Sequence, residues 1–221
     1  MFRPCPLLLV LMFLTSIACS QTLTQADVKN LLAKIRERRM SASDLHANFQ
    51  EQKTIHLLNK PIVSNGKIWF DAPNKFRREV SGSSPSITVS NGRDLWIYYS
   101  NFKSAEHYTL GKRSPVEAVI TAINTALNLE NVEKTFQISG TKVGNGYELQ
   151  LLPRSLSTKR MFQRFDLRLN GDLVAERTDM IQPNGEQIVT VYSNQTRAPI
   201  PESTFEFTPP AGTEITNPLG R

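Results

Sequence analysis

Glycine-containing turn signals divide the chain beyond residue 43 into short stretches in which apolar and polar residues alternate. Alternation with a period of two is typical of strands that bury one face, and Asn-Gly supplies the positive φ that tight hairpins require. The pattern predicts strands at residues 44–57, 66–70, 86–90, 95–100, 135–140, 147–152, 163–169, 173–181 and 187–195. Short strands at such spacing favour one antiparallel sheet that is strongly curved or barrel-like.

Asn91-Gly92 is the strongest of these hairpin signals. If these two residues form the turn, Thr88 faces Leu95 and Ile87 faces Trp96, so both faces of the hairpin carry apolar groups. Two interpretations stay open at this point. Either a helix packs on one face and a loop covers the other, or one face lines an apolar cavity that admits lipid chains.

Two segments have helical periodicity instead. Residues 24–40 carry an apolar stripe at helical spacing, and either Thr24 or Asp27 can cap the helix. A second helix is predicted from Pro115, capped by the preceding serine, through Leu129. A helix inserted between hairpins must bury its apolar stripe, and the concave side of the sheet is the expected place.

The C-terminal segment from residue 199 is rich in proline and threonine. We expect Phe205 and Phe207 to dock on the fold, because large aromatic side chains gain most from burial. Residues 213–221 are expected to form a frayed end.

The N-terminus has the form of a secretory signal peptide. Arg3 precedes an unbroken apolar run at residues 7–14, and small residues follow at 16–20. We therefore expect residues 1–20 to be removed on export and residues 21–221 to form a single domain. The alternative is a lipid-modified N-terminus at Cys19, which would anchor the protein in a membrane.

The sequence offers little for chemistry. His46, His56 and His107 have no partner at metal-ligand spacing, and no nucleophile motif or phosphate loop occurs, so we expect no enzyme, catalytic residue, metal or cofactor. The formal net charge is +6, and the charged run at residues 34–39 is typical of a solvated helix face. Acidic membrane proteins or anionic lipid headgroups are the expected partners of this charge, and nucleic acid is not.

Four stretches carry a family resemblance: FQ at residues 49–50, GKIWFDAPNKFR at 66–77, SITVSNGRDLWIY at 86–98 and FEFTPPAG at 205–212. In this order they resemble the LolA-like outer-membrane lipoprotein carrier family. The resemblance implies a mainly β fold with an α lid, an unclosed antiparallel β-barrel (half-barrel) whose helices cover an apolar cavity.

The same resemblance implies a function and partners. A carrier of this kind is a periplasmic monomer that makes and breaks no bond. It binds the acyl chains of lipid-modified proteins released by an inner-membrane ABC-type complex and delivers them to an outer-membrane acceptor lipoprotein. The alternatives are a related lipid or glycolipid carrier, an anchored lipoprotein acceptor, or an envelope-stress sensor of the same fold.

The resemblance also implies which residues line the cavity: Ile68, Phe70, Phe76, Leu95, Ile97, Val116, Val119 and Ile120. The best-known carriers have an arginine directly before the proline of the second stretch, where it holds the lid closed. Ala72 stands at that latch position here. Arg77 or Arg78 can substitute for the latch, but strand alternation directs only one of them inward.

Overall fold

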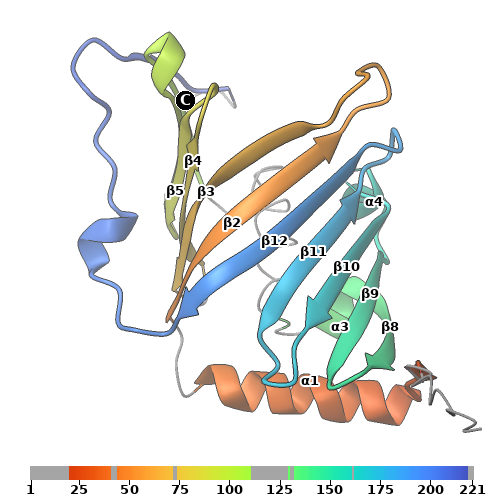
Figure 1. Ribbon diagram of the computed structural model, residues 1–221. Coiled ribbons are helices and arrows are strands. Elements are labelled where there is room, and N and C mark those ends of the chain that lie inside the picture. The colour runs from red at the N-terminus through yellow and green to blue at the C-terminus, as the bar shows by residue number, and fades with distance from the viewer. Residues whose placement is uncertain are drawn as a thin grey trace, which may run out of the picture.

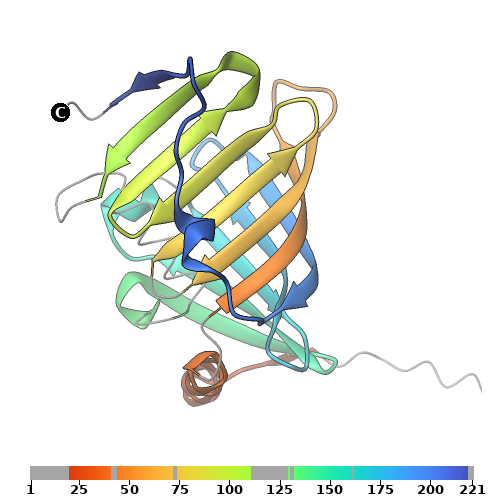
Figure 2. The same ribbon diagram turned by 90° about the vertical axis from the view of Figure 1, so that its left-hand side faces the viewer.

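The computed structural model describes residues 20–40, 44–71, 74–110, 129, 132–160 and 162–218. A single sheet of thirteen strands forms the body of the protein, in the order β1-β8-β9-β10-β11-β12-β2-β3-β4-β5-β6-β7-β13. The strands are β1 (Gln21–Thr22), β2 (Asp44–Thr54), β3 (Ile62–Asp71), β4 (Lys75–Ser81), β5 (Ser86–Asn91), β6 (Asp94–Tyr99), β7 (Ser104–Thr109), β8 (Phe136–Val143), β9 (Gly146–Pro153), β10 (Arg164–Leu169), β11 (Ala175–Ile181), β12 (Gln187–Thr196) and β13 (Glu214–Thr216). The sheet twists strongly, and its edge strands β1 and β13 do not meet, which leaves an open half-barrel (Figures 1 and 2).

The predicted antiparallel sheet is confirmed, with one parallel exception where β13 pairs with β7. Each predicted strand is present within a few residues, although β2 ends at Thr54 and the chain turns at residues 55–61. Strands β4 and β7 are additions that the alternation did not predict. In β4 the consecutive charges Arg77, Arg78 and Glu79 hide the period, because Arg77 and Glu79 pair with each other on one face and Arg78 pairs with Glu51 on the other.

The β5–β6 hairpin has a different turn from the predicted one. Ser90 pairs with Leu95 and Thr88 with Ile97, so Gly92 and Arg93 form the turn. Asn91 ends its strand, and its side-chain oxygen accepts hydrogen bonds from the backbone N–H groups of the two residues that follow Gly92. Gly92 has a φ of +88°, which favours glycine at this position. The prediction was wrong by two residues, a shift that keeps each side chain on its predicted face.

Helix α1 (Gln25–Met40) begins as predicted. The backbone N–H of Asp27 donates to the hydroxyl of Thr24 at 3.2 Å, and the backbone N–H of Thr24 donates back to the Asp27 carboxylate at 3.1 Å. Figure 1 shows the helix lying across one end of strands β8 to β11. Its apolar stripe is buried in the main core together with side chains of β8, β9 and β10: Val28, Leu31, Leu32, Ile35, Phe136, Ile138, Leu149, Leu151, Phe165 and Leu167.

The charged run of α1 is largely exposed, as expected for a solvated helix face. Arg36 lies at its border with α3 (Val132–Thr135), where its guanidinium bonds both carboxylate oxygens of Glu133 at 2.7 Å. None of the helices in the described part of the chain is long and apolar enough to cross a membrane.

The C-terminal segment is more ordered than predicted. Phe205, in the short helix η2 (Glu202–Phe205), is buried, and the ring of Phe207 lies 5.7 Å from that of Tyr98. Beyond them β13 pairs with β7, so the predicted frayed end is wrong for its residues. Its three residues are all exposed, so backbone pairing with an open edge, rather than burial, orders this segment.

Several predictions fall outside the described residues. These are the signal peptide up to residue 19, the lipidation alternative at Cys19, the latch position Ala72, and the helix from Pro115 up to residue 128. Leu129, the predicted last residue of that helix, is described and is not helical, because its φ is +55°. It is fully buried in the core beside α1.

Candidate functional site

The register of the sheet assigns each side chain to one of two faces. We call the face that α1 packs against the inner face, and the face under the C-terminal segment the outer face. On the inner face, directly paired residues form continuous rows across the strands. One row runs through Leu45, Phe70, Phe76, Ser90, Leu95 and Tyr108, and the next through Ala47, Ile68, Arg78, Thr88, Ile97 and Glu106.

Five of the predicted cavity residues lie on this inner face: Ile68, Phe70, Phe76, Leu95 and Ile97. Phe70 and Leu95 are buried, and the other three are half-buried. Phe76 stands between Phe70 and Ser90, one residue from the start of β4. The other three, Val116, Val119 and Ile120, lie outside the described residues. The register thus gathers the described five on one apolar surface.

A polar group interrupts this apolar surface. Arg78, on the inner face of β4, forms an ion pair with Glu51 of β2 at 2.8 Å. Its guanidinium carbon also lies 4.4 Å from the centre of the Phe49 ring, a cation–π distance. The same ring lies close to Gly66, where a Cβ atom would stand 2.7 Å from the ring and 1.9 Å from the backbone oxygen of Glu79. Glycine at this position therefore allows the close approach of both the aromatic ring and the backbone of β4.

The two arginines of β4 point to opposite faces, as strand alternation predicts. Arg78 is the inward one. Arg77 points outward, where it bonds Glu79 at 2.7 Å and donates to the backbone oxygen of Thr204 at 3.2 Å. Arg78 is thus the arginine that shares the inner face with the predicted cavity residues.

A second polar group lies near the β7 margin of the inner face. Glu106 accepts hydrogen bonds from the hydroxyls of Tyr99, at 3.4 Å, and Tyr108, at 2.5 Å. Burial, together with this carboxylate, raises the pKa of Tyr108 to about 12. Burial also raises the pKa of Tyr192, whose hydroxyl lies 3.4 Å from that of Thr178 further along the inner face. The hydroxyls of Tyr99 and Tyr108 therefore stay protonated at neutral pH and donate to the Glu106 carboxylate.

Sequence reasoning missed these polar positions. Glu51 and Glu106 each occupy an inward position of a strand. The partner of Glu51 comes from β4, which was not predicted, and Glu106 itself lies with its partner Tyr108 on β7, which was not predicted either. The available signal was an acidic residue in register with apolar neighbours, such as Glu51 two residues after Phe49.

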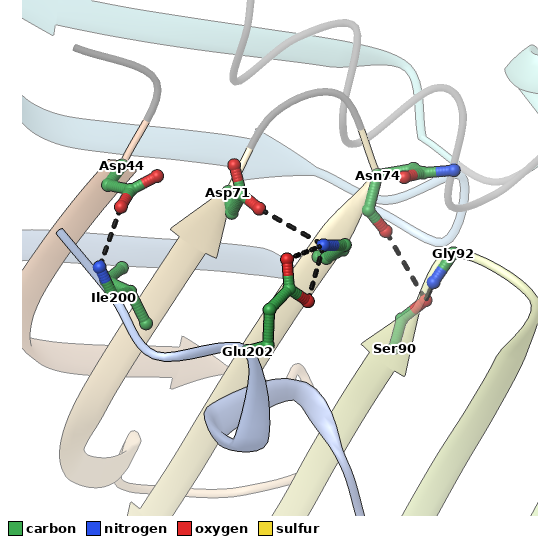
Figure 3. Close-up of polar contacts among 8 residues, drawn as sticks. Asp44, Asp71, Asn74, Ser90, Gly92, Ile200 and Glu202 are labelled. Atoms are coloured by element: carbon green, nitrogen blue, oxygen red, sulfur yellow. Dashed lines mark hydrogen bonds and ion pairs between the residues drawn. The ribbon is translucent and has the colours of Figure 1, made fainter.

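The C-terminal segment is fastened beside the latch position. Figure 3 shows the carboxylate of Asp44 accepting the backbone N–H of Ile200 at 2.7 Å. The ammonium of Lys75 lies 2.6 Å from a carboxylate oxygen of Glu202 and 3.5 Å from Asp71, and its bond to Glu202 raises its pKa. Lys75 thus joins the end of β3, at Asp71, and the start of β4 to the C-terminal segment.

The histidines are in strands or turns. His46 of β2 stacks on Trp69 at 5.0 Å, and His107 of β7 stacks on Trp96 and bonds Asp94 at 2.8 Å. Among the described residues, no group of three or more His, Cys, Asp or Glu could hold a metal ion.

Comparisons with known sequences point to one family, and a comparison with solved structures shows the fold. The sequence model described as outer membrane lipoprotein carrier protein LolA matches residues 40–208. The outer-membrane lipoprotein carrier protein of Klebsiella pneumoniae (strain 342) is 24% identical over 192 residues, 86% of either chain. Its namesake from Yersinia pestis bv. Antiqua (strain Angola) is 22% identical over 211 residues, 95% of this chain and 96% of that protein. An uncharacterized conserved protein from Thermus thermophilus shares the fold, with a TM-score of 0.52 at 12% identity, over 86% of this chain and 99% of that one.

Proposed function

The chain belongs to the LolA family of outer membrane lipoprotein carrier proteins, and from this premise we propose that it binds and carries the acyl chains of lipid-modified proteins. One observation supports this most directly: Ile68, Phe70, Phe76, Leu95 and Ile97 share one face of an open sheet. An acyl chain offers nothing to hydrogen-bond, so a receptor for it must present apolar surface rather than directional polar anchors.

The physical demand on a carrier is binding that is strong and still reversible. Each methylene that leaves water contributes about 0.8 kcal/mol, so a long chain is held firmly by contact area alone. The Glu51–Arg78 pair limits this area, because an acyl chain gains little against charged groups. The proposed binding surface is therefore the set of apolar side chains around this pair: Ile68, Phe70, Phe76, Leu95 and Ile97.

The proposed route follows from the family. Lipid-modified proteins are received from an ABC-type releasing complex of the inner membrane and delivered to an acceptor lipoprotein of the outer membrane. The carrier is exported, acts as a periplasmic monomer, and makes or breaks no covalent bond. In this proposal Val116, Val119 and Ile120 belong to the lid over the acyl chains. Arg78 takes the role of the latch arginine, because the uncharged Ala72 stands at the latch position.

Neighbouring positions on opposite faces of β3 provide a matched test. Ile68 points inward and Lys67 outward, so Ile68→Gln and Lys67→Gln introduce the same side chain on the two faces. We expect Ile68→Gln to weaken binding of a fluorescent fatty-acyl probe by about five-fold to ten-fold, because apolar contact area is lost. Lys67→Gln should leave the affinity unchanged.

Equal affinities of the two variants, with melting temperatures showing both folded, would contradict the assignment of the inner face. Mass spectrometry of lipid that copurifies with the wild-type protein separates lipoprotein acyl chains from the alternative of a glycolipid. If a glycolipid copurifies, the proposed binding surface stays the same and the proposed cargo is replaced.

A further inference from the structure

The exposed apolar side chains gather at one end of the sheet. This end, which we call the loop end, consists of residues 55–61, 82–85, 100–103, 154–160 and 182–186. The antiparallel register puts these turns at the same end of their strands, because Thr54 pairs with Gln187, Arg164 with Ile181 and Ser86 with Tyr99. Figure 1 shows the β2–β3 and β11–β12 turns and α4 (Leu156–Lys159) at this end, while α1 lies at the other.

Exposure at the loop end is extreme for large apolar residues. Leu57 is 94% exposed, Phe102 79% and Leu156 76%. Among the described residues, all but one of the exposed large apolar side chains lie on or beside the loop end: Leu57, Leu58, Ile62, Val63, Phe102, Leu152, Leu156 and Ile215. The exception is Val191, in the middle of β12. Apolar side chains concentrated at one end of a soluble protein indicate an interaction site.

Hydrogen bonds hold the turn that carries Phe102. This residue lies in the short helix η1 (Ser100–Phe102), where the side-chain amide of Asn101 donates to the backbone oxygen of Ser83 at 2.8 Å. Lys103 then adopts a left-handed conformation with a φ of +47°, and its backbone N–H donates to Ser100. The aromatic ring is thus exposed on a hydrogen-bonded turn.

The other two turns are supported in the same way. Ser155 caps α4 by accepting the backbone N–H of Thr158 at 3.1 Å, so Leu156 is presented from a defined first turn. In the β2–β3 turn, His56 lies so close to Gly185 that a Cβ there would stand 2.8 Å from its ring nitrogen. The ion pair between Lys53 and Glu186, at 3.4 Å, joins the same two turns.

Exposed basic side chains accompany the apolar ones. Lys60 follows Leu57 in the same turn, Lys103 directly follows Phe102, and Lys159 and Arg160 follow Leu156 at the end of α4. The acidic residues of this region are Glu186, already paired with Lys53, and Glu214 at the start of β13. The loop end therefore combines separate exposed apolar side chains with an excess of positive charge.

We propose that the loop end docks on the surface of an anionic phospholipid bilayer. Leu57, Phe102 and Leu156 enter the boundary between headgroups and acyl chains, and the neighbouring basic side chains contact lipid phosphates. Separate apolar side chains flanked by positive charge suit a fluid anionic surface, whereas a protein partner is expected to need a contiguous apolar patch. The proposal is independent of acyl-chain binding on the inner face.

Cosedimentation with vesicles tests the proposal on the chain from residue 21, without cargo. Vesicles contain equal parts phosphatidylglycerol and phosphatidylcholine, with phosphatidylcholine alone as the neutral comparison. We expect binding to the anionic vesicles that falls with added salt. Substituting Leu57, Phe102 and Leu156 together by serine should weaken it at least about 100-fold, and Lys60→Glu with Lys103→Glu at least about 25-fold.

Matched controls lie away from the loop end. Val191→Ser removes an exposed apolar side chain from the middle of the sheet, and Lys142→Glu reverses a charge at the opposite end, so both should bind as the wild type. Ile68→Gln should also bind normally, which separates docking from acyl-chain capture. Absence of wild-type binding, equal binding of the loop-end variants, or loss of binding in Ile68→Gln alone would overturn the proposal.

Discussion

Replacing Glu51 by Gln leaves the guanidinium of Arg78 on the inner face without its carboxylate partner. The two side chains are 24% and 27% exposed and 2.8 Å apart, so the pair is intermediate between a surface and an interior ion pair. Surface pairs contribute about 0–1 kcal/mol, whereas breaking a fully buried pair costs about 3–5 kcal/mol. For a pair exposed by about a quarter, we expect Glu51→Gln to lower the free energy of unfolding by about 2 kcal/mol.

The partner substitution is Arg78→Met, which keeps an aliphatic stem against the Phe49 ring and removes the charge. It should also cost about 2 kcal/mol, because the Glu51 carboxylate is then left unpaired. The double variant has no uncompensated charge. We therefore expect it to lose about 2 kcal/mol less than the sum of the single variants.

Urea unfolding of the four proteins gives these free energies, provided that the dependence on urea concentration is the same in all four. Glu148→Gln is the control, because Glu148 and Arg168 form a pair at 3.6 Å with both side chains about half exposed. It should cost under about 0.5 kcal/mol. Additive single-variant losses at Glu51 and Arg78 would refute the reasoning.

Two further perturbations test other parts of the fold. Burial raises the pKa of Asp166 above its ordinary value of 3.8 despite the nearby Arg164, so this group's contribution to stability falls as the pH rises from 3.8 through the folded pKa. Asp166→Asn should therefore exceed the wild type in free energy of unfolding at neutral pH and lose that advantage below about pH 3.8, and an advantage independent of pH would contradict this. Phe205→Ala should cost about 3–4 kcal/mol, because a ring only 2% exposed fastens the C-terminal segment. Hydrogen exchange should then accelerate in β13, and unchanged protection there would show that β13 is held independently of Phe205.

Much of the fold was accessible to sequence reasoning. The sheet, most of its strands, α1 and the docking of Phe205 were predicted and are present, and Thr24 caps α1, as one of the two predicted alternatives. Strand β4 was missed because charged residues occupy both of its faces and mask the period, with Arg77 paired to Glu79 on one face and Arg78 to Glu51 on the other. The β5–β6 turn was misplaced because Asn91 serves the turn through its side chain, not through its own φ.

The residues of the candidate site also fall into those that could be predicted from the sequence and those that could not. Alternation placed Ile68 with Phe70 and Leu95 with Ile97 in advance, and the family resemblance implied that both pairs share the inner face, as they do. Glu51 opposite Arg78 could not, because the strands that carry them are separated by β3 and their contact depends on the sheet's register. The loop end could not be predicted either, since its exposed apolar side chains Leu57, Phe102 and Leu156 come from turns more than 40 residues apart in the sequence.

The sequence by itself determined which side chains of a strand point the same way, because alternation of side-chain direction is a local property of extended backbone. It also determined where the chain turns to within a few residues. Only the tertiary structure decided which rows meet across the sheet, which charges pair inside it, and that Leu57, Phe102 and Leu156 emerge at one end. Those relations depend on long-range pairing of strands, which the pattern within any one strand does not contain.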